Sequence, residues 1–388
     1  MGSSQDLSDV RAIMMAFAER TGLAAGESTM QRYLWTDAFA VCAFLSLFER
    51  ADDRSCFDLA IRLIDRVHRT LGRHRQDDAR SGWISGLDEE EGGRHPTAGG
   101  LRIGKRLNER PPGQAQNEPE EWDRDGQYFH YLTKWMHALE RTAVVTSDVD
   151  YCRWGLELAQ TAHSAFVYSV PDGSQRMYWK MSIDLTRPLV SSMGHHDPLD
   201  ALVSYSELEY CRMRHFSDAE LPSLGSRIGE AAAMCAGKSW VSEDPLGIGG
   251  LLVDIYRLSQ LQAFGTGIPV ATLTHLLADA RTGLDLIASS YPFHASAEYR
   301  LAFRELGLTI GLRAVEALRQ RLTIDPGSLA GDSAGGVEAL ERYVALADQI
   351  ESFWRTPDNQ SNSTWTDHVD INSVMLATSL LPGQFLLV

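Results

Sequence analysis

The sequence predicts an all-α fold of the (α/α)6 toroid type, a closed ring of about twelve helices arranged as six hairpins. Two observations predict this fold. Apolar residues recur at helical spacing along most of the chain, as in Phe57, Ile61 and Ile64, and this period is typical of amphipathic helices. Helices with one charged face also alternate with helices that are apolar almost all round, and these must be surrounded by protein.

The same periodicity gives the helix boundaries that we expect. They are residues 7–20, 33–50, 54–74, 126–146, 149–168, 198–213, 223–239, 249–264, 268–289, 297–321, 334–355 and 367–381. Equivalent points along the chain are irregularly spaced, which favours a closed toroid with loop insertions over a solenoid of fixed period. We therefore expect one domain over residues 1–388.

Two segments depart from the helical pattern. Bulky and β-branched residues that follow the turn Pro171-Asp172-Gly173 predict one small β-hairpin, around Met177 to Leu185. Residues 75–121 form the longest irregular segment, and structureless segments of this size in compact domains are usually functional or disordered. The tryptophan, histidine and glycine content of this insertion predicts an ordered lid over a cavity.

Composition excludes several classes of partner. The chain has 36 basic and 52 acidic residues, which gives a net charge of −16. An acidic surface repels phosphate backbones and anionic lipids, so we expect no nucleic acid and no membrane as a partner. No apolar run approaches the roughly 20 residues that a membrane span requires. Residues 1–10 lack the basic and apolar regions of a secretory signal.

Cysteine usage and motifs bear on location and cofactors. The five cysteines are odd in number and scattered, and none forms a C-x-x-C pair. This usage is typical of reduced core residues, so we expect a cytoplasmic protein. Residues 247–250 do not match the glycine motif that follows a strand in nucleotide-binding proteins, and we expect no cofactor. Adjacent side chains such as His195, His196 and Asp197 rarely ligate one ion together, so we expect no metal.

Aromatic, acidic and histidine residues gather where the even-numbered helices begin. The starts read Trp35-Thr36-Asp37, Trp122-Asp123-Arg124-Asp125, His195-His196-Asp197-Pro198, Asp244-Pro245, Tyr291-Pro292-Phe293-His294 and Trp365-Thr366-Asp367-His368. Aspartate and proline are ordinary capping and first-turn residues, but capping does not explain the tryptophans and histidines beside them. Because the inner helices of a toroid run parallel, we expect these starts to meet at one end and line a pit.

Such a pit suits carbohydrates. Aromatic rings stack on the C–H faces of sugars, carboxylates accept hydrogen bonds from hydroxyls, and paired carboxylates cleave glycosidic bonds. With its alternating helices and these starts, the chain resembles the six-hairpin glycosidase-like superfamily, which includes sugar epimerases of the N-acylglucosamine 2-epimerase type. No signature of one particular family is matched. The resemblance implies a carbohydrate-active enzyme, which we expect to be a glycoside hydrolase that acts on a sugar or oligosaccharide.

Candidate residues come from the helix starts and from the long insertion. The expected acid and base are Asp125 and Asp197, since a carboxylate among indoles tends to have a raised pKa, which suits a general acid. Further catalytic candidates are Asp123, Asp37, Asp367 and His195. The candidate substrate-binding residues are Trp35, Trp83, His95, Arg102, Lys105, Trp122, Tyr128, His130, His196, Trp365, His368 and Asp370.

Three other functions stay open. A sugar epimerase or isomerase would place its acid–base chemistry on His195, His196 or His368. A non-catalytic carbohydrate-binding protein would need the aromatic residues without the carboxylates. A terpene cyclase-like enzyme would bind metal through a D-D-x-x-D motif, which neither residues 52–56 nor residues 77–81 complete.

Overall fold

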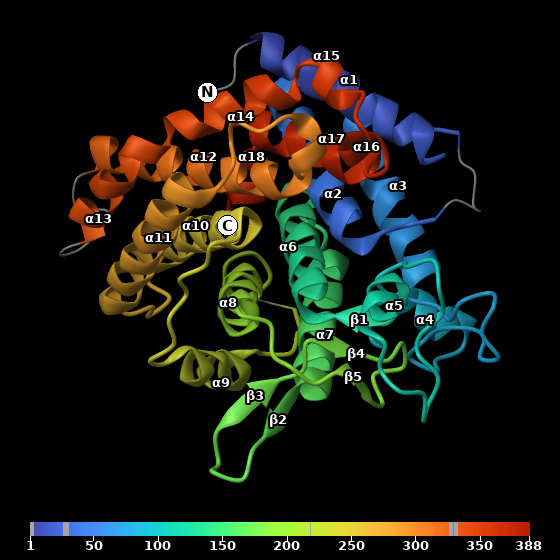
Figure 1. Ribbon diagram of the computed structural model, residues 1–388. Coiled ribbons are helices and arrows are strands. Elements are labelled where there is room, and N and C mark those ends of the chain that lie inside the picture. Colours follow the sequence, from blue (N-terminus) through green and yellow to red (C-terminus); the bar gives the residue numbers. More distant parts are fainter. Residues whose placement is uncertain (1–3, 26–30, 218, 326–328, 330–332) are drawn as a thin grey trace. The chain divides into compact units, whose positions relative to one another are not determined.

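The computed structural model describes residues 4–25, 31–217, 219–325, 329 and 333–388, which are drawn in Figure 1. Of the described residues, 65% are helical and 5% lie in strands. The prediction of an all-α chain with little strand is therefore confirmed. The α-helices are α1 (Ser4–Arg20), α2 (Leu34–Ala51), α3 (Arg54–Leu71), α4 (Glu89–Arg94), α5 (Glu118–Asp123), α6 (Phe129–Thr146), α7 (Val149–Phe166), α8 (Asp197–His215), α9 (Gly225–Cys235), α10 (Pro245–Ala263), α11 (Val270–Ser290), α12 (Ala302–Ile324), α13 (Ser333–Leu340), α14 (Ala345–Trp354), α15 (Pro357–Gln360), α16 (Ser363–Thr366), α17 (Val369–Leu380) and α18 (Gly383–Leu386).

The long helices follow the apolar stripes of the sequence. Each of the predicted ranges overlaps an observed helix. The range 334–355 differs most, because it is divided into α13, the 3-10 turn η2 (Glu341–Tyr343) and α14. The helices α4, α5, α15, α16 and α18 lie outside the predicted ranges. They contain only four to six residues each, too few to produce a periodic stripe.

The strands form two small antiparallel sheets rather than the single expected hairpin. The strands are β1 (Gln127–Tyr128), β2 (Val167–Ser169), β3 (Gln175–Met177), β4 (Lys180–Met181) and β5 (Pro188–Val190). β2 pairs with β3, and β4 lies between β1 and β5. The expected range Met177–Leu185 is corrected, because the predicted turn lies inside the β2–β3 hairpin. Val170 N–H donates to the Ser174 carbonyl at 2.9 Å and closes that turn, and Gly173 supplies its positive φ of +86.

Contacts between Cα atoms divide the chain into two compact units. Unit 1 comprises Met1–Ala18, Cys42–Asp53 and Gly237–Val388, and unit 2 comprises Glu19–Val41 and Arg54–Ala236. The helices α6 to α9 belong wholly to unit 2, and α10 to α18 belong wholly to unit 1. The expectation of one domain over the whole chain stays a prediction.

Each unit has its own apolar core. In unit 2, Trp135 and Phe166 are completely buried. In unit 1, Trp354 is completely buried and Trp240 is 1% exposed. The indole N–H of Trp135 donates to His68 Nε2 at 3.1 Å. Burial lowers the pKa of His68 to about 3, so this imidazole stays neutral and accepts the hydrogen bond at ordinary pH.

In unit 2, α6 and α8 lie side by side, and the residues that pair between them show that the two helices run in the same direction. A residue earlier in α6 pairs with a residue earlier in α8, and a later residue pairs with a later one. Lys134 Nζ lies 2.9 Å from Asp200 Oδ1, and His137 Nδ1 lies 3.1 Å from Glu207 Oε2. α7 packs against both helices and is antiparallel to α6, because only residues 147–148 connect the two.

In unit 1, α10 and α12 also run parallel, and they approach closely at glycines. Gly249 of α10 lies against the backbone of Gly307 and against Gly311 in α12. Further along both helices, Arg321 of α12 donates to the Ser259 hydroxyl of α10 at 3.4 Å, which fixes the same direction.

α14 packs on α12 in the opposite direction. Trp354, at the end of α14, donates to Glu305 near the start of α12 at 2.7 Å, whereas the earlier Asp348 accepts from the later Arg313 at 2.7 Å. Both units therefore contain parallel helices with antiparallel neighbours, as the alternation in the sequence predicts for helical hairpins. Closure of six hairpins into a ring stays a prediction.

The glycine contact between α10 and α12 yields a testable prediction. A Cβ at Gly249 would lie 2.1 Å from the Gly307 carbonyl oxygen. Gly249→Ala should therefore push the helices apart and lower the free energy of unfolding by about 1–3 kcal/mol in urea titrations. Gly250→Ala is the matched control, because a Cβ there meets nothing within 4 Å. Equal stability of the two variants would contradict the predicted close packing.

Candidate functional site

Three helix starts of unit 2 lie together. Trp35 is in the first turn of α2, His130 is in the first turn of α6, and Asp197 is the first residue of α8. The rings of Trp35 and His130 lie 6.0 Å apart, and His130 Nδ1 lies 3.8 Å from Asp197 Oδ1. Within this unit, helix starts that the sequence singled out are therefore neighbours in space.

Aromatic rings surround His130. Its ring centroid lies 5.3 Å from that of Tyr128, 6.3 Å from that of Trp179 and 4.8 Å from that of Tyr131. The planes of Trp179 and His130 are nearly parallel, at 22°. The His130 side chain is 24% exposed, so a ligand can reach it. The His130 cluster comprises Trp35, Tyr128, His130, Tyr131, Trp179 and Asp197.

The surroundings of His130 keep its imidazole neutral. Burial lowers the pKa of His130 to about 4, while Asp200 acts to raise this pKa and Lys134 acts to lower it. At neutral pH the ring is therefore unprotonated and can accept a proton. Burial also raises the pKa of the Tyr131 phenol well above its ordinary value. The Tyr131 hydroxyl stays protonated and lies 2.5 Å from the hydroxyl of Tyr33.

A pair of opposite charges lies one helical turn further along the same two helices. Lys134 follows His130 by four residues, and Asp200 follows Asp197 by three, so each pair faces one side of its helix. Lys134 donates to Asp200 at 2.9 Å, and the two side chains are 11% and 8% exposed. Because these charges compensate each other, the pair places no lone buried charge beside His130.

The loop before α8 fits closely around Asp197. A Cβ at Gly194 would lie 2.4 Å from Asp197 Oδ2, so a larger residue there would displace the carboxylate. His196 is the N-cap residue of α8, and the ring of the exposed His195 lies 4.8 Å from it. The predicted residues His195 and His196 therefore directly precede the carboxylate of the cluster.

Asp125 is completely buried and holds neighbouring segments together. Its Oδ2 accepts from Arg102 at 2.6 Å and from Arg75 at 3.2 Å, and its Oδ1 accepts from the N–H groups of Gly104 and Gly126 at 2.9 Å and 3.1 Å. These donors occupy the lone pairs that a general acid or base would use. A catalytic role for Asp125 stays a prediction that these contacts do not favour.

The other predicted carboxylates of unit 2 differ in burial. Asp37 is 1% exposed and accepts from Arg32 at 3.0 Å. Asp123 is exposed, at the end of α5. Asp123 is not an N-cap, whereas Asp37 accepts from the backbone N–H of Tyr33, directly before α2, at 3.2 Å, as a capping carboxylate does. In unit 1, Asp244 caps α10 and accepts from the Leu246 N–H.

The long insertion 75–121 is built into unit 2. Besides its bond to Asp125, Arg102 donates to two backbone carbonyls near the end of α3 at 2.7 Å and 2.8 Å. Trp83 is 4% exposed, and the space beside Gly92 is filled by its indole. Arg102 and Trp83 therefore hold this segment in place. That the insertion covers a cavity stays a prediction.

Two further predicted residues lie on the same insertion. His95 Nδ1 lies 2.7 Å from a carboxylate oxygen of Glu157 on α7. Lys105 Nζ lies 5.4 Å from the centre of the Tyr33 ring, and Tyr33 contacts Tyr131 of the His130 cluster. Of the residues predicted on the insertion, Lys105 therefore lies at the border of the His130 cluster.

Helix starts also lie together in unit 1. Asp244 at the start of α10 accepts from Arg304 in the first turn of α12 at 2.7 Å. The neighbouring Phe303 ring lies 6.3 Å from that of His368, the N-cap residue of α17. The starts of α10, α12 and α17 therefore converge within this unit.

The predicted residues near α17 are mostly exposed. Asp367 and His368 are exposed and Asp370 is half-buried. Trp365 is the exception, because it is 4% exposed and stacks on Trp354 at 5.7 Å. Trp365 therefore packs in the core of unit 1, and its predicted contact with a ligand stays a prediction.

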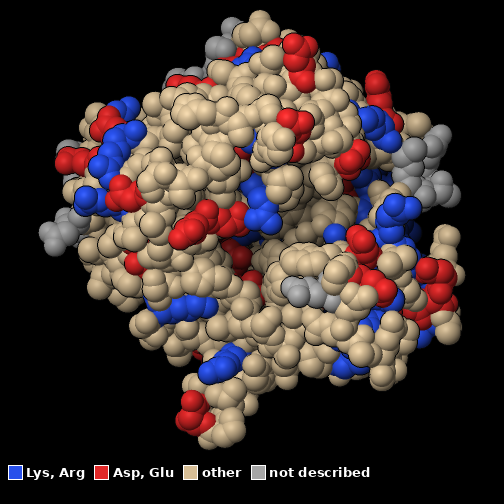
Figure 2. Space-filling model, viewed as in Figure 1, with Lys and Arg blue, Asp and Glu red and all other residues tan. Residues whose placement is uncertain are grey.

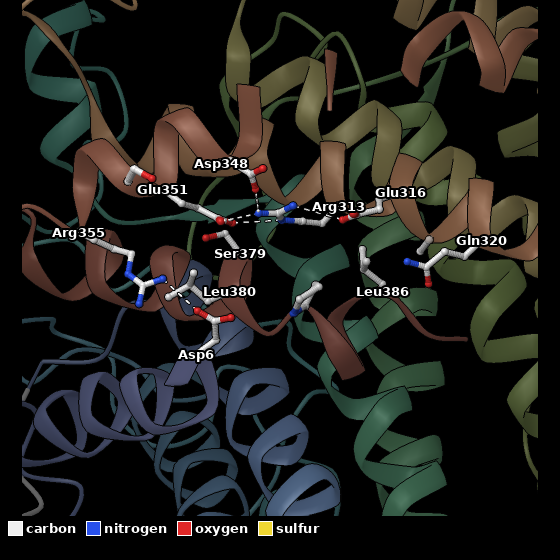
Figure 3. A pocket seen from close by; sticks show the side chains of 13 residues that line it. Asp6, Arg313, Glu316, Gln320, Asp348, Glu351, Arg355, Ser379, Leu380 and Leu386 are labelled. Carbon is white, nitrogen blue, oxygen red and sulfur yellow. Dashed lines mark hydrogen bonds and ion pairs between the residues drawn. The ribbon is translucent and has the colours of Figure 1, made fainter. Parts of the chain in front are cut away.

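Unit 1 contains a pocket of about 460 Å³, lined by residues of α1, α12, α14, α18 and the end of α17. Figure 3 shows Arg313 between Glu316 on one side and Asp348 and Glu351 on the other. The guanidinium lies 2.6 Å from Glu351, 2.7 Å from Asp348 and 3.3 Å from Glu316. These lining charges pair with one another, as in a structural ion-pair network. The pocket is lined by residues other than those predicted for the site.

Sequence reasoning missed Tyr131, Trp179, Lys134 and Asp200. A usable signal existed for Lys134 and Asp200, because each lies one helical turn after a predicted site residue and so faces the same side. Trp179 lies between β3 and β4. No periodic pattern connects this loop position with His130.

The surface and the helices bear on the expected partners. On the face shown in Figure 2, Lys and Arg side chains are interspersed with Asp and Glu side chains. Within the described ranges, no helix combines the length and the apolar character needed to cross a membrane. The absence of a nucleic-acid partner stays a prediction.

Comparison with known proteins gives no family for this chain. No protein-family model matches it, and a search of the curated proteins found no significant match. In the described part of the chain, no three side chains of His, Cys, Asp or Glu come together as a metal site. The class that can be stated is a mostly helical protein in which unit 2 gathers an imidazole, a carboxylate and aromatic rings. The resemblance to the six-hairpin glycosidase-like superfamily stays a prediction.

Proposed function

We propose that the chain is a carbohydrate-active enzyme that transfers a proton on a free sugar, as an epimerase or isomerase does, at the His130 cluster. The observation that carries this proposal is the neutral imidazole of His130, partly exposed among aromatic rings and 3.8 Å from the carboxylate of Asp197. A positioned neutral imidazole can accept a proton as a general base, and the pKa of about 4 makes His130 a weaker base than an unperturbed histidine. The nearby Asp197 carboxylate stabilises the imidazolium that forms when the base accepts a proton.

In the proposed reaction, the imidazole of His130 removes the proton from carbon 2 of the open-chain sugar. The C–H electron pair forms an enediolate with the neighbouring carbonyl group, and the phenol of Tyr131 is a hydrogen-bond donor for the enediolate oxygen. A solvent proton delivered to the opposite face of carbon 2 gives the epimer, and His130 then releases its proton to solvent. Return of the His130 proton to carbon 1, with transfer of the O2 hydroxyl proton to O1, gives the isomeric ketose. The step consumes no oxidant and no reductant.

The aromatic rings of the cluster support a sugar as the ligand. The half-buried Trp179 has an apolar face beside the polar imidazole, and the buried rings of Trp35 and Tyr128 pack around the same imidazole. Apolar walls with a few placed polar groups are the usual composition of a small-molecule site. The C–H faces of a sugar suit the rings, and its hydroxyls suit the polar groups.

Glycoside hydrolysis is the second candidate function. It requires two carboxyl groups that flank the glycosidic bond. Asp197 suits one of these roles, but the expected partner Asp125 is held by Arg102 and Arg75. Proton transfer therefore has more support than hydrolysis.

The (α/α)6 toroid is proposed as the fold around this site. Its support is the packing inside each unit, where parallel helices have antiparallel neighbours and helix starts converge at Trp35, His130 and Asp197 or at Asp244, Phe303 and His368. A toroid closes such hairpins into one ring.

Incubation in heavy water tests the proposed function. With a panel of aldoses and N-acetylhexosamines, deuterium should enter carbon 2 of an unbroken sugar, which proton NMR detects as loss of that signal. Release of reducing ends from nitrophenyl glycosides, without deuterium exchange, would replace the proposal by hydrolysis. Binding of sugars with neither reaction would favour a non-catalytic carbohydrate-binding protein. No binding by any sugar would overturn the carbohydrate proposal as a whole.

A further inference from the structure

The aromatic rings of the His130 cluster continue outward to the surface of unit 2. Trp179 contacts Trp122, whose ring centroid lies 5.3 Å away with its plane at 79°. Trp122 is 49% exposed, whereas Tyr128 on the inner side of Trp179 is 4% exposed. The rings of Trp122, Trp179 and His130 therefore form a continuous path from solvent to the imidazole.

A buried lysine fixes the position of Trp122. Lys180, which follows Trp179 and is 0% exposed, donates to the Glu121 carbonyl at 2.7 Å, to the Glu121 carboxylate at 2.9 Å and to the Arg124 carbonyl at 2.8 Å. The acceptors flank Trp122 on both sides, and they use all three donors of the ammonium group. The two tryptophans are thus joined through one buried cation as well as through their rings.

Further bonds hold the same short helix. Arg110 donates to the second carboxylate oxygen of Glu121 at 3.0 Å and to the Leu189 carbonyl of β5 at 2.7 Å. The exposed indole of Trp122 is therefore presented by a rigid support. Rigid support reduces the entropy lost on binding, and it is typical of residues that contact a ligand.

We propose that the substrate is an oligosaccharide rather than a monosaccharide, and that Trp122 binds the sugar unit next to the reacting one. This inference rests on the proposed function. One sugar ring that reacts at His130 covers the rings that touch the imidazole. Trp122 is separated from His130 by Trp179, so a ligand that reaches both ends of the aromatic path needs a second unit.

Chain-length dependence of binding tests this inference. The probes are glucose, mannose and N-acetylglucosamine with their α-1,4- and β-1,4-linked di- and trisaccharides, measured by calorimetry and by deuterium exchange. Trp122→Ala should raise the Kd and KM of the longer sugars about two- to tenfold, the range for one aromatic contact, and leave kcat unchanged. The constants for the monosaccharides should not change. Trp122→Phe should restore most of the loss, because it keeps an aromatic face.

The control is Tyr299→Ala, which removes an aromatic side chain that is 74% exposed in unit 1. It should leave all constants unchanged, and far-UV circular dichroism should show both alanine variants folded. Sugar binding that does not depend on chain length, or on Trp122, overturns this inference and leaves the proposed function standing. Absence of any sugar binding or exchange overturns both.

Discussion

Asp125→Asn should lower the free energy of unfolding by about 3–5 kcal/mol, the cost of breaking a buried ion pair by removing one partner. Asparagine has nearly the same shape, but it removes the charge and replaces one acceptor oxygen by an NH2 donor. Asp125 is 0% exposed, and the side chains of its partners Arg102 and Arg75 are 9% and 13% exposed. Neutralising the carboxylate leaves the Arg102 guanidinium in this interior without its counter-charge, whereas Arg75 keeps its ion pair with Asp77 at 2.7 Å. Urea or thermal unfolding measures the loss.

The sequence alone gives the opposite expectation for this variant. If Asp125 were a general acid at a helix start, asparagine would preserve the fold and remove most of the activity. Asp123→Asn is the matched control, because Asp123 is exposed two residues earlier and its substitution should change stability by no more than about 0.5 kcal/mol. Equal stability of the two variants, with activity lost only in Asp125→Asn, would restore the catalytic assignment.

The helices could be predicted from the sequence because their signal is local. A stripe such as that of Phe57, Ile61 and Ile64 repeats within two turns and requires no knowledge of the partner. The short helices α4 and α5 carry no such stripe. Contacts with distant segments hold these helices instead. For α5 these contacts come from Lys180, about sixty residues later. The turn Pro171-Asp172-Gly173 was predicted, but the hairpin was expected after this turn, whereas β2 and β3 flank it. Strand pairing on both sides of a turn is not readable from residue types alone.

The site could be predicted only in part. Trp35, His130 and Asp197 lie together because each occupies a helix start, and this is a property that the sequence reveals. Asp125, like Asp197, is an aspartate shortly before or at the start of a helix. Its different role is due to Arg102, whose arrival beside Asp125 depends on the path of the insertion. Residue type and position along a helix therefore do not separate a carboxylate at the site from one bound by arginine.

His130→Gln should reduce deuterium exchange into the sugar about 10²- to 10⁴-fold, the usual contribution of a positioned base. Folding should persist, because glutamine is polar and the His130 side chain is partly exposed.

The pKa of His130 is lowered to about 4, so the base form persists well below neutral pH. In the unaltered protein, kcat/KM should fall only as the pH drops through about 4, whereas an unperturbed histidine would lose its base form near pH ~6.5.

Variants of Lys134 test the role of His130 through the pH dependence of kcat/KM, which would not change if His130 had only a structural role. Its positive charge acts to lower the pKa of His130, and Asp200 acts to raise it. Lys134→Met should therefore shift the acid limb of kcat/KM to higher pH, and Asp200→Asn should shift it to lower pH. His275→Gln, at a histidine whose side chain is 53% exposed in unit 1, is the control and should change neither the rate nor the limb. Full exchange activity in His130→Gln, with loss of activity in a variant of His195, His196 or His368, would move the chemistry to the histidines that the sequence first suggested for an epimerase.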